Sequence, residues 1–246
     1  MLTRVHHVGL VVRRLEDGLA LWRDRLGLEI SAQATVADQG VKAALLAIGR
    51  SEIELLEPID EQGGVATFLA KRGEGLHHVC FETPDVAADL AGARERGFPL
   101  IDEVPRPGLA GSICFLHPKG TAGVLVEFAT PPGDSVHAGH AGHGPLAGLA
   151  LRDVRARSRD GAAAAELFTT RLGLERRGET TVAVGGVHLH FVASDGPEGL
   201  AGLVLEVDDL VAARGALGAL GAATTDEGVT LAPDRCHGVP ITVAAR

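Results

Sequence analysis

The sequence predicts an α+β fold of four βαβββ modules, paired into two domains. Three observations predict it. The run VHHVGLVV near the amino terminus recurs as LHHVCFET 71 residues later. Each copy is followed by one helical stretch and three short strand-like runs. Weaker echoes of the same unit occur twice more in the second half of the chain.

The two copies in the first half share one order of elements. In the first copy, leucines at helical spacing precede Gly27, which is expected to end the helix. In the second copy, Asp85 begins a helix and Gly97 ends it. The closing strands are IELLEP (53–58) and VEFATP (126–131), which align with a glutamate in second place.

The second half repeats fragments of the first. RLGLE stands at 25–29 and again at 171–175. GEGLHHVCFETPD (73–85) has an echo in GPEGLAGLVLEVDD (196–209). We therefore expect a second, degenerate pair of the same modules.

A Pro-, Gly- and His-rich segment separates the two halves and is read as a linker. We expect a first domain at 1–133, with modules at about 4–58 and 75–131, a linker at 134–145, and a second domain at 146–246. The linker histidines are interpreted as solvated residues rather than ligands: His137, His140 and His143.

Composition excludes several classes of protein. With 246 residues, 46% of them hydrophobic, the chain is long enough for a substantial core. A net charge of −9 argues against general nucleic-acid or anionic-membrane binding. No apolar run is long enough to span a bilayer, and the start lacks a signal-peptide apolar region. We expect a cytoplasmic protein whose three cysteines are reduced and buried.

Four residues align between the two modules of the first half. His7 and His78 lie in the opening strands, and Glu54 and Glu127 lie in the closing strands. Strand alternation selects the second histidine of each pair as the symmetric choice. Two imidazoles and two carboxylates suit a divalent first-row metal, and charged groups are rarely buried unless paired or metal-bound. The sequence therefore predicts one metal site in the first half.

The preceding histidines have the opposite strand phase. His6 and His77 are therefore expected to pack, or to support the ligands, rather than to bind the ion. A single histidine in a strand is usually such a packed or hydrogen-bonded residue. The aligned recurrence favours the metal interpretation for the other member of each pair.

At these residues the chain resembles the vicinal oxygen chelate (glyoxalase/bleomycin-resistance/dioxygenase) superfamily. More narrowly, the first half resembles the methylmalonyl-CoA epimerase family. The most specific stretches are KRGEGLHHVCFE and FLHPKGTAGVLVEF, and similarity covers residues 4–129 almost without a gap.

The resemblance implies an eight-stranded cleft built from paired modules. It implies one divalent metal ion (Co, Mn, Ni or Zn) held by His7, Glu54, His78 and Glu127. It implies inversion at C2 of methylmalonyl-CoA or a related 2-substituted acyl-CoA. Proton removal puts charge on the thioester oxygen, which a metal stabilises. Glu127 is the candidate catalytic base, with Glu54 as the alternative.

The chain departs from the family in one catalytic position. Some members carry a glutamate shortly after the QGV stretch, where this chain has Ala43. The second acid/base residue is therefore unnamed. Lys42, next to it, is expected to face solvent.

The second half departs further. Two of its four aligned positions keep ligand-type residues, so a full metal site is not expected there. The replacements are Asp153 for His7, His190 for Glu54, Gly202 for His78 and Thr242 for Glu127.

Three other functions remain open. A glyoxalase I-like lyase acting on a glutathione hemithioacetal uses the same ligand types. A ring-cleaving dioxygenase usually needs a tyrosine, and this chain has none. A non-catalytic small-molecule-binding member typically lacks the metal quartet. The chain is expected to be either a homodimer or a monomer whose second half takes the place of a partner subunit.

Overall fold

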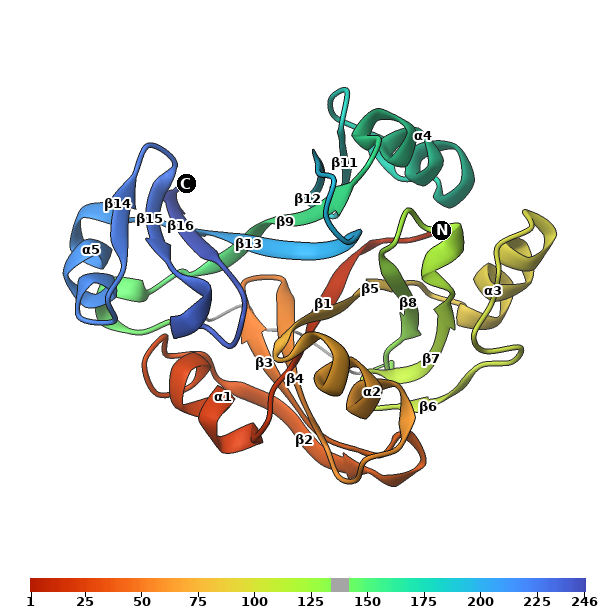
Figure 1. The fold of residues 1–246 in the computed structure, drawn as a ribbon, viewed down its shortest axis with the longest axis horizontal. Coiled ribbons are helices and arrows are strands. Elements are labelled where there is room, and N and C mark those ends of the chain that lie inside the picture. The colour runs from red at the N-terminus through yellow and green to blue at the C-terminus, as the bar shows by residue number, and fades with distance from the viewer. Residues whose placement is uncertain (134–141) are drawn as a thin grey trace. The chain divides into compact units, whose positions relative to one another are not determined.

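The computed structural model describes residues 1–133 and 142–246 (Figure 1). In the first half, one helix lies between two modules of the same order. The elements are β1 (Arg4–Val11), α1 (Leu15–Trp22), β2 (Ile30–Val36), β3 (Val41–Ile48), β4 (Ser51–Pro58), α2 (Gly63–Arg72), β5 (Gly75–Glu82), α3 (Val86–Glu95), β6 (Arg106–Gly108), β7 (Gly111–Leu116) and β8 (Leu125–Thr130).

The second half repeats the order without a helix between its modules. Its elements are β9 (Ala150–Ser158), α4 (Gly161–Leu172), β10 (Glu175–Arg176), β11 (Thr181–Val184), β12 (Val187–Ala193), β13 (Gly199–Val207), α5 (Leu210–Gly218), β14 (Ala223–Thr225), β15 (Gly228–Leu231) and β16 (Ile241–Ala245).

Each half forms one eight-stranded sheet with the same topology. The first sheet has the order β2-β3-β4-β1-β5-β8-β7-β6, and the second has the order β10-β11-β12-β9-β13-β16-β15-β14. The opening strands of the two modules are neighbours at the middle of each sheet, β1 beside β5 and β9 beside β13. The other strands of each module continue toward the two edges. The predicted α+β fold of four βαβββ modules is confirmed, including the degenerate pair.

Helix ends follow the predicted signals in one module and depart from them in the other. Asp85 caps α3, its side chain accepting a hydrogen bond from the Ala88 amide at 2.9 Å, and Gly97 follows with φ 72°. Helix α1 ends at Trp22, before Gly27. Irregular turns follow up to Gly27, which has φ 78°: the Arg25 amide bonds to the Leu21 carbonyl at helical spacing, and the Leu26 amide bonds to the same carbonyl five residues back.

Helix α2 was not among the predicted elements. It lies between the first two modules, and only Ala66 of its residues is buried. Its Phe68 meets the His77 ring edge-on, with centroids 5.1 Å apart. His77 is therefore a packing residue, as its strand phase predicts.

Contacts group the chain into two compact units, and each unit draws on both halves of the sequence. One unit comprises the described residues of Met1–His7, His78–Val136 and Asp153–Ala201. The other comprises the described residues of Val8–His77, His137–Arg152 and Gly202–Arg246.

Inside each unit, the two halves make close contacts at glycines. In the first unit, a Cβ at Gly123 would lie 2.4 Å from Glu198 Cβ, and one at Gly185 would lie 2.4 Å from Arg4 Cβ. In the second, a Cβ at Gly238 would lie 2.2 Å from the Glu74 carbonyl oxygen, and one at Gly49 would lie 2.7 Å from Ala150 Cβ.

These contacts are reciprocal. Gly238 corresponds to Gly123 in the repeat, and Glu74 corresponds to Glu198, so the pair in one unit reproduces the pair in the other with the halves exchanged. The contacts of Gly49 and Gly185 are related in the same way. Reciprocity of this kind is the defining property of an interface between two copies of one fold.

Further half-to-half packing is seen in the first unit. The Arg171 guanidinium lies over the Phe98 ring, 4.1 Å from its centroid, an attractive cation–π contact. A small apolar cavity is lined by residues of both halves, among them Val5, Val79, Phe81, Val154 and Leu189. The second half therefore shares buried apolar surface with the first.

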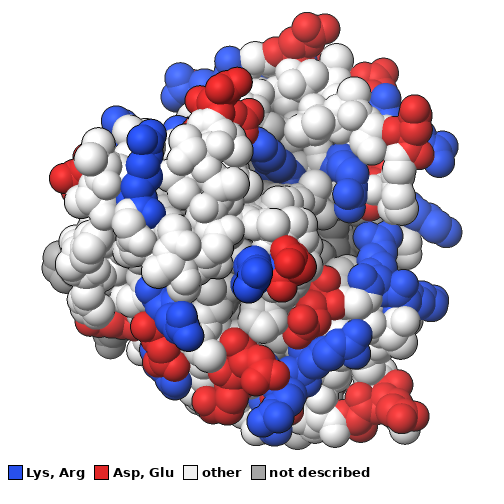
Figure 2. Space-filling view, turned by 60° about the vertical axis from the view of Figure 1, so that its left-hand side comes forward, with Lys and Arg blue, Asp and Glu red and all other residues white. Residues whose placement is uncertain are grey.

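The surface carries both signs of charge. On the face drawn in Figure 2, acidic and basic side chains are interspersed, so the net charge of −9 is not gathered into one block there. Across residues 1–133 and 142–246, no helix combines the length and apolarity needed to cross a bilayer.

The contact at Gly238 predicts a stability effect. Gly238 has φ +80°, and an added methyl would meet the Glu74 carbonyl, so we expect Gly238→Ala to lower the free energy of unfolding by at least about 2 kcal/mol. Gly215→Ala, in α5 with open space around it, is the control. It should raise the free energy of unfolding by about 0.5–1 kcal/mol. Urea denaturation followed by circular dichroism measures both. Equal stability of the two variants would contradict the packing described.

The three cysteines are free and buried, as the sequence predicts. Burial raises the pKa of Cys114 and of Cys236 to about 12, against a usual value of about 8.5. A raised thiol pKa favours the neutral form, so these thiols should stay unreactive toward a disulfide reagent from pH 7 to pH 10. All three should react after denaturation. Rapid labelling of the native protein with an apparent pKa near 8.5 would be inconsistent with this burial.

Candidate metal centre

Three of the four predicted ligands contact one another directly. His7 of β1, His78 of β5 and Glu127 of β8 have side chains that are at most 4% exposed. Their ring nitrogens His7 Nε2 and His78 Nε2 lie 2.9 Å apart. Glu127 Oε2 lies 2.9 Å from His7 Nε2 and 3.2 Å from His78 Nε2. The three atoms therefore form a nearly equilateral triangle.

The triangle is not explained by hydrogen bonding alone. Glu127 Oε2 is buried and accepts no well-directed hydrogen bond, although both imidazoles are close. A buried carboxylate oxygen without a directed donor is costly. The two imidazoles can share one hydrogen bond between their Nε2 atoms, at 2.9 Å, but that bond leaves Glu127 Oε2 without a partner.

The separations suit a small metal ion. Bonds of about 2.1 Å from one ion to nitrogen and oxygen put neighbouring ligand atoms about 3.0 Å apart at right angles and about 3.4 Å apart at the tetrahedral angle. The observed edges of 2.9, 2.9 and 3.2 Å are close to the right-angle value. Imidazole and carboxylate are the ligand types that divalent first-row metals share. The residues present therefore fit such an ion.

The sheet register explains why these atoms meet. In β8, Glu127 stands opposite Cys80 of β5 and opposite Phe115 of β7, so the three side chains share one face of the sheet. Two residue pairs along the same strands, and therefore on the same face, His78 stands opposite Leu125. A single-residue shift in register would turn Glu127 to the other face.

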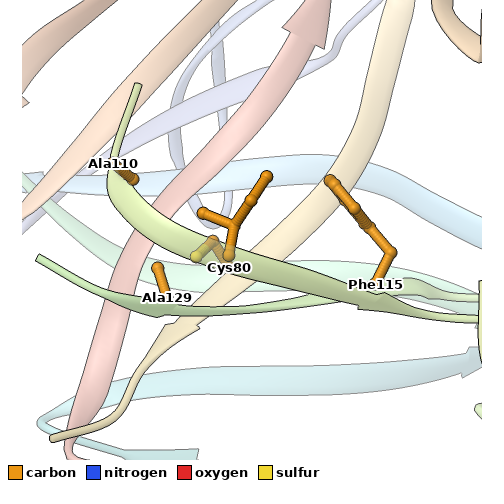
Figure 3. Packing of buried hydrophobic residues seen from close by; sticks show 5 residues of the cluster. Cys80, Ala110, Phe115 and Ala129 are labelled. Atoms are coloured by element: carbon orange, nitrogen blue, oxygen red, sulfur yellow. The ribbon is translucent and has the colours of Figure 1, made fainter. Parts of the chain in front are cut away.

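An apolar cluster includes Cys80 and Phe115, the two residues that stand opposite Glu127 in the sheet. It consists of Cys80, Ala110, Ile113, Phe115 and Ala129, all buried (Figure 3). Phe115 also meets the His78 ring edge-on, with centroids 5.3 Å apart. Arg106 lies over Phe115, 5.5 Å from its centroid, and is held by Asp102 at 3.0 Å. The cluster lowers the local dielectric and strengthens every charge interaction of Glu127.

The electrostatics of Glu127 reflect this environment. Burial raises its pKa, but the neighbouring His7 and His78 more than offset that and hold the pKa of Glu127 well below its usual range. Glu127 is therefore an ionised carboxylate, the form that binds a cation.

His6 supports His7, as its strand phase suggests. The two Nδ1 atoms lie 2.9 Å apart, and His6 is 1% exposed. One of these nitrogens must donate and the other must accept. If the His7 proton sits on Nδ1, the Nε2 that faces His78 and Glu127 is left with a free lone pair, which is the arrangement a metal ligand needs.

The fourth predicted ligand and its neighbours lie in β3 and β4. Glu54 is 7% exposed. Like His7 and His78, it is a buried side chain of a kind that can bind a metal ion. Ala43 is buried and offers no acid or base. Lys42 is half exposed and pairs with Glu57 at 2.7 Å, which confirms that it faces solvent.

The second half holds a cluster of one carboxylate and two histidines, and one of these histidines is not among the aligned positions. Asp153 of β9 lies 3.0 Å from His188 Nδ1 and 3.6 Å from His190 Nε2. Asp153 and His190 were named in the alignment, but His188 was missed because its counterpart, Glu52, is not one of the four predicted ligands. The run HLH at 188–190 is the sequence signal for this cluster, because alternate residues of a strand project from the same face.

Of the three linker histidines, the structure describes His143. His137 and His140 lie outside the described residues. His143 is exposed and lies 4.0 Å from Glu29. Its exposure agrees with the interpretation of a solvated residue.

Comparison with known proteins gives the same grouping for the first half. A model of the Glyoxalase/Bleomycin resistance protein/Dioxygenase superfamily matches residues 6–117. The ethylmalonyl-CoA/methylmalonyl-CoA epimerase of Cereibacter sphaeroides is 36% identical over 130 residues, which cover 52% of this chain and 97% of that protein. Human mitochondrial methylmalonyl-CoA epimerase is 32% identical over 128 residues, covering 51% and 73%.

Solved structures agree with the sequence relatives. A methylmalonyl-CoA epimerase in complex with methylmalonyl-CoA and NH4+ is 38% identical, covers 54% of this chain and 97% of its own, and superimposes with a TM-score of 0.53. The Mycobacterium tuberculosis methylmalonyl-CoA epimerase is 35% identical, covering 53% and 89%, with a TM-score of 0.51. The relatives are isomerases. The chain therefore belongs to the Glyoxalase/Bleomycin resistance protein/Dioxygenase superfamily, and its first half is an epimerase-like pair of modules.

Proposed function

We propose that the protein epimerises methylmalonyl-CoA, or a related 2-substituted acyl-CoA, at C2. We propose further that His7, Glu54, His78 and Glu127 hold one divalent metal ion, with Co, Mn, Ni and Zn as candidates. The observation that carries the proposal is the buried Glu127 oxygen that lies within 3.2 Å of two imidazole nitrogens without a directed hydrogen bond.

The donor set matches the chemistry of the reaction. The hydrogen at C2 is acidified by a thioester and lies beside a carboxylate, and its removal puts negative charge on the thioester oxygen. A bound divalent cation supplies a Lewis acid for that charge. Phe115 and the rest of the apolar cluster limit water beside Glu127, so charges there interact strongly.

We assign Glu127 two tasks, ligand and proton acceptor at C2. A base must be ionised before it accepts a proton, and Glu127 is held in that form. Its low pKa also makes it a weak base, which favours the ligand role. Epimerisation needs a second group on the opposite face of C2, and Ala43 does not provide one.

We further propose that the chain has two domains, at 1–133 and 146–246, and that the second stands in for a partner subunit. The reciprocal glycine contacts support this, because each half meets the other through equivalent positions. The proposed role of the second domain is to complete the packing around the first.

Adjacent histidines allow a matched test of the metal assignment. We expect His78→Ala to weaken the tightest-bound equivalent of Co²⁺ or Zn²⁺ at least about tenfold, because loss of even a supporting residue costs about 10–100-fold. His77→Ala, which removes a ring packed on Phe68, is the control and should leave that affinity unchanged. Isothermal titration of chelator-treated protein measures both. Equal effects of the two substitutions would refute the assignment.

The activity is tested by isotope exchange. Metal-loaded protein in deuterated water should exchange the C2 hydrogen of methylmalonyl-CoA and interconvert its epimers. Glu127→Gln should lower turnover at least about 100-fold, in the range of a lost general base. Glu103→Gln, an exposed carboxylate paired with Arg94, is the control.

Metal analysis of Glu127→Gln separates the two tasks. An inactive variant that retains the metal assigns Glu127 to proton transfer or charge balance, and an active one shows that another group is the base. Wild-type protein that binds metal but exchanges no C2 hydrogen would overturn the epimerase proposal. A glutathione hemithioacetal is then the next substrate to assay.

A further inference from the structure

A second cluster of metal-binding side chains lies in the second half. Asp153, His188 and His190 offer donor atoms that all lie within 4.8 Å of one another. Asp153 belongs to β9, and both histidines belong to the adjacent β12. All three lie in the same compact unit.

Strand geometry holds the three side chains together. His188 and His190 are two residues apart in β12, so they project from the same face. The register puts His188 directly opposite Asp153. His188 Nδ1 then lies 3.0 Å from Asp153 Oδ1, and His190 Nε2 lies 3.6 Å from the same oxygen.

The second nitrogen of His190 is already occupied. Its Nδ1 lies 2.9 Å from the Thr181 hydroxyl of β11. A hydrogen bond at one ring nitrogen fixes the ring orientation and leaves the other nitrogen to face a ligand, which is the usual arrangement of a metal-bound histidine. Here the nitrogen that remains is the one directed at Asp153.

The carboxylate of this cluster is buried and its two imidazoles are partly exposed, so an ion could enter from solvent and leave again. The Asp153 side chain is 7% exposed, whereas those of His188 and His190 are each 38% exposed. A buried carboxylate gains from a cation beside it, and half-exposed imidazoles leave a path for entry.

Two members of the cluster occupy repeat positions that hold predicted ligands in the first half. Asp153 aligns with His7, and His190 aligns with Glu54, so carboxylate and imidazole have exchanged strands. His188 aligns with Glu52 and adds a third donor. Counting only the four aligned ligands predicts no site here, because His188 is outside that set.

We propose that Asp153, His188 and His190 form a second binding site for a divalent transition-metal ion. Two imidazoles and one carboxylate leave open positions and suit Fe²⁺, Co²⁺, Ni²⁺, Cu²⁺ or Zn²⁺ rather than Mg²⁺ or Ca²⁺. Arg155 stands opposite His190 in the register, so a cation lies on the neighbouring strand. The site is therefore weaker than one made of four buried ligands, and it is independent of the proposed epimerase activity.

The test counts metal ions on the full chain. Chelator-treated protein is titrated with Zn²⁺, and histidine ring signals are followed by NMR. Wild-type protein should bind two equivalents, with the weaker one perturbing His188 and His190. His188→Asn and His190→Asn should each weaken that equivalent at least about tenfold. His117→Asn, a half-buried histidine elsewhere, is the control and should change nothing.

A double variant separates this site from the first. His78→Ala combined with Glu127→Gln should abolish the tighter equivalent and leave the weaker one at His188 and His190. The proposal is overturned if wild-type protein binds a single equivalent that this double variant loses. It is also overturned if a second equivalent persists unchanged in both His188→Asn and His190→Asn.

Discussion

The ionised carboxylate of Glu127 is buried beside two imidazoles, and the arrangement around it follows from that burial. An isolated charge in an apolar sheet face is strongly unfavourable, so it needs opposite charge or directed donors. His7 and His78 come within 3.2 Å, yet they leave one oxygen without a directed hydrogen bond. The register of β5, β7 and β8 keeps that oxygen on the same face as the imidazole of His78. The site is preorganised for positive charge.

Much of this site was predictable because it follows from a repeat and from strand alternation. The recurrence of HH identified the opening strands, and alternation selected His7 and His78 over His6 and His77. The contact of His77 with Phe68 and the contact of His6 with His7 agree with that selection. The four-module fold was predicted for the same reason, since repeated patterns constrain each other.

Neither the repeat nor strand alternation predicts helix α2, the end of α1 or the role of His188. Helix α2 has little buried surface, so its sequence has no clear apolar stripe to detect. The early end of α1 depends on backbone bonds that no residue pattern announces. His188 aligns with Glu52, which is not one of the four predicted ligands, so the repeat does not point to it. Distances between side chains on β9 and β12 depend on register, which the sequence does not specify by itself.

The reciprocal glycine contacts have an evolutionary consequence. In an assembly of two identical chains, every substitution appears twice, so a residue that improves one copy must be tolerated by the other. When both copies are written into one gene, this coupling is lost. Glycines at the half-to-half contacts and the apolar strands are present in both halves, whereas Gly202 and Thr242 stand where the first half has His78 and Glu127. Covalent joining thus lets one half keep His78 and Glu127 while the other half carries different residues at the same positions.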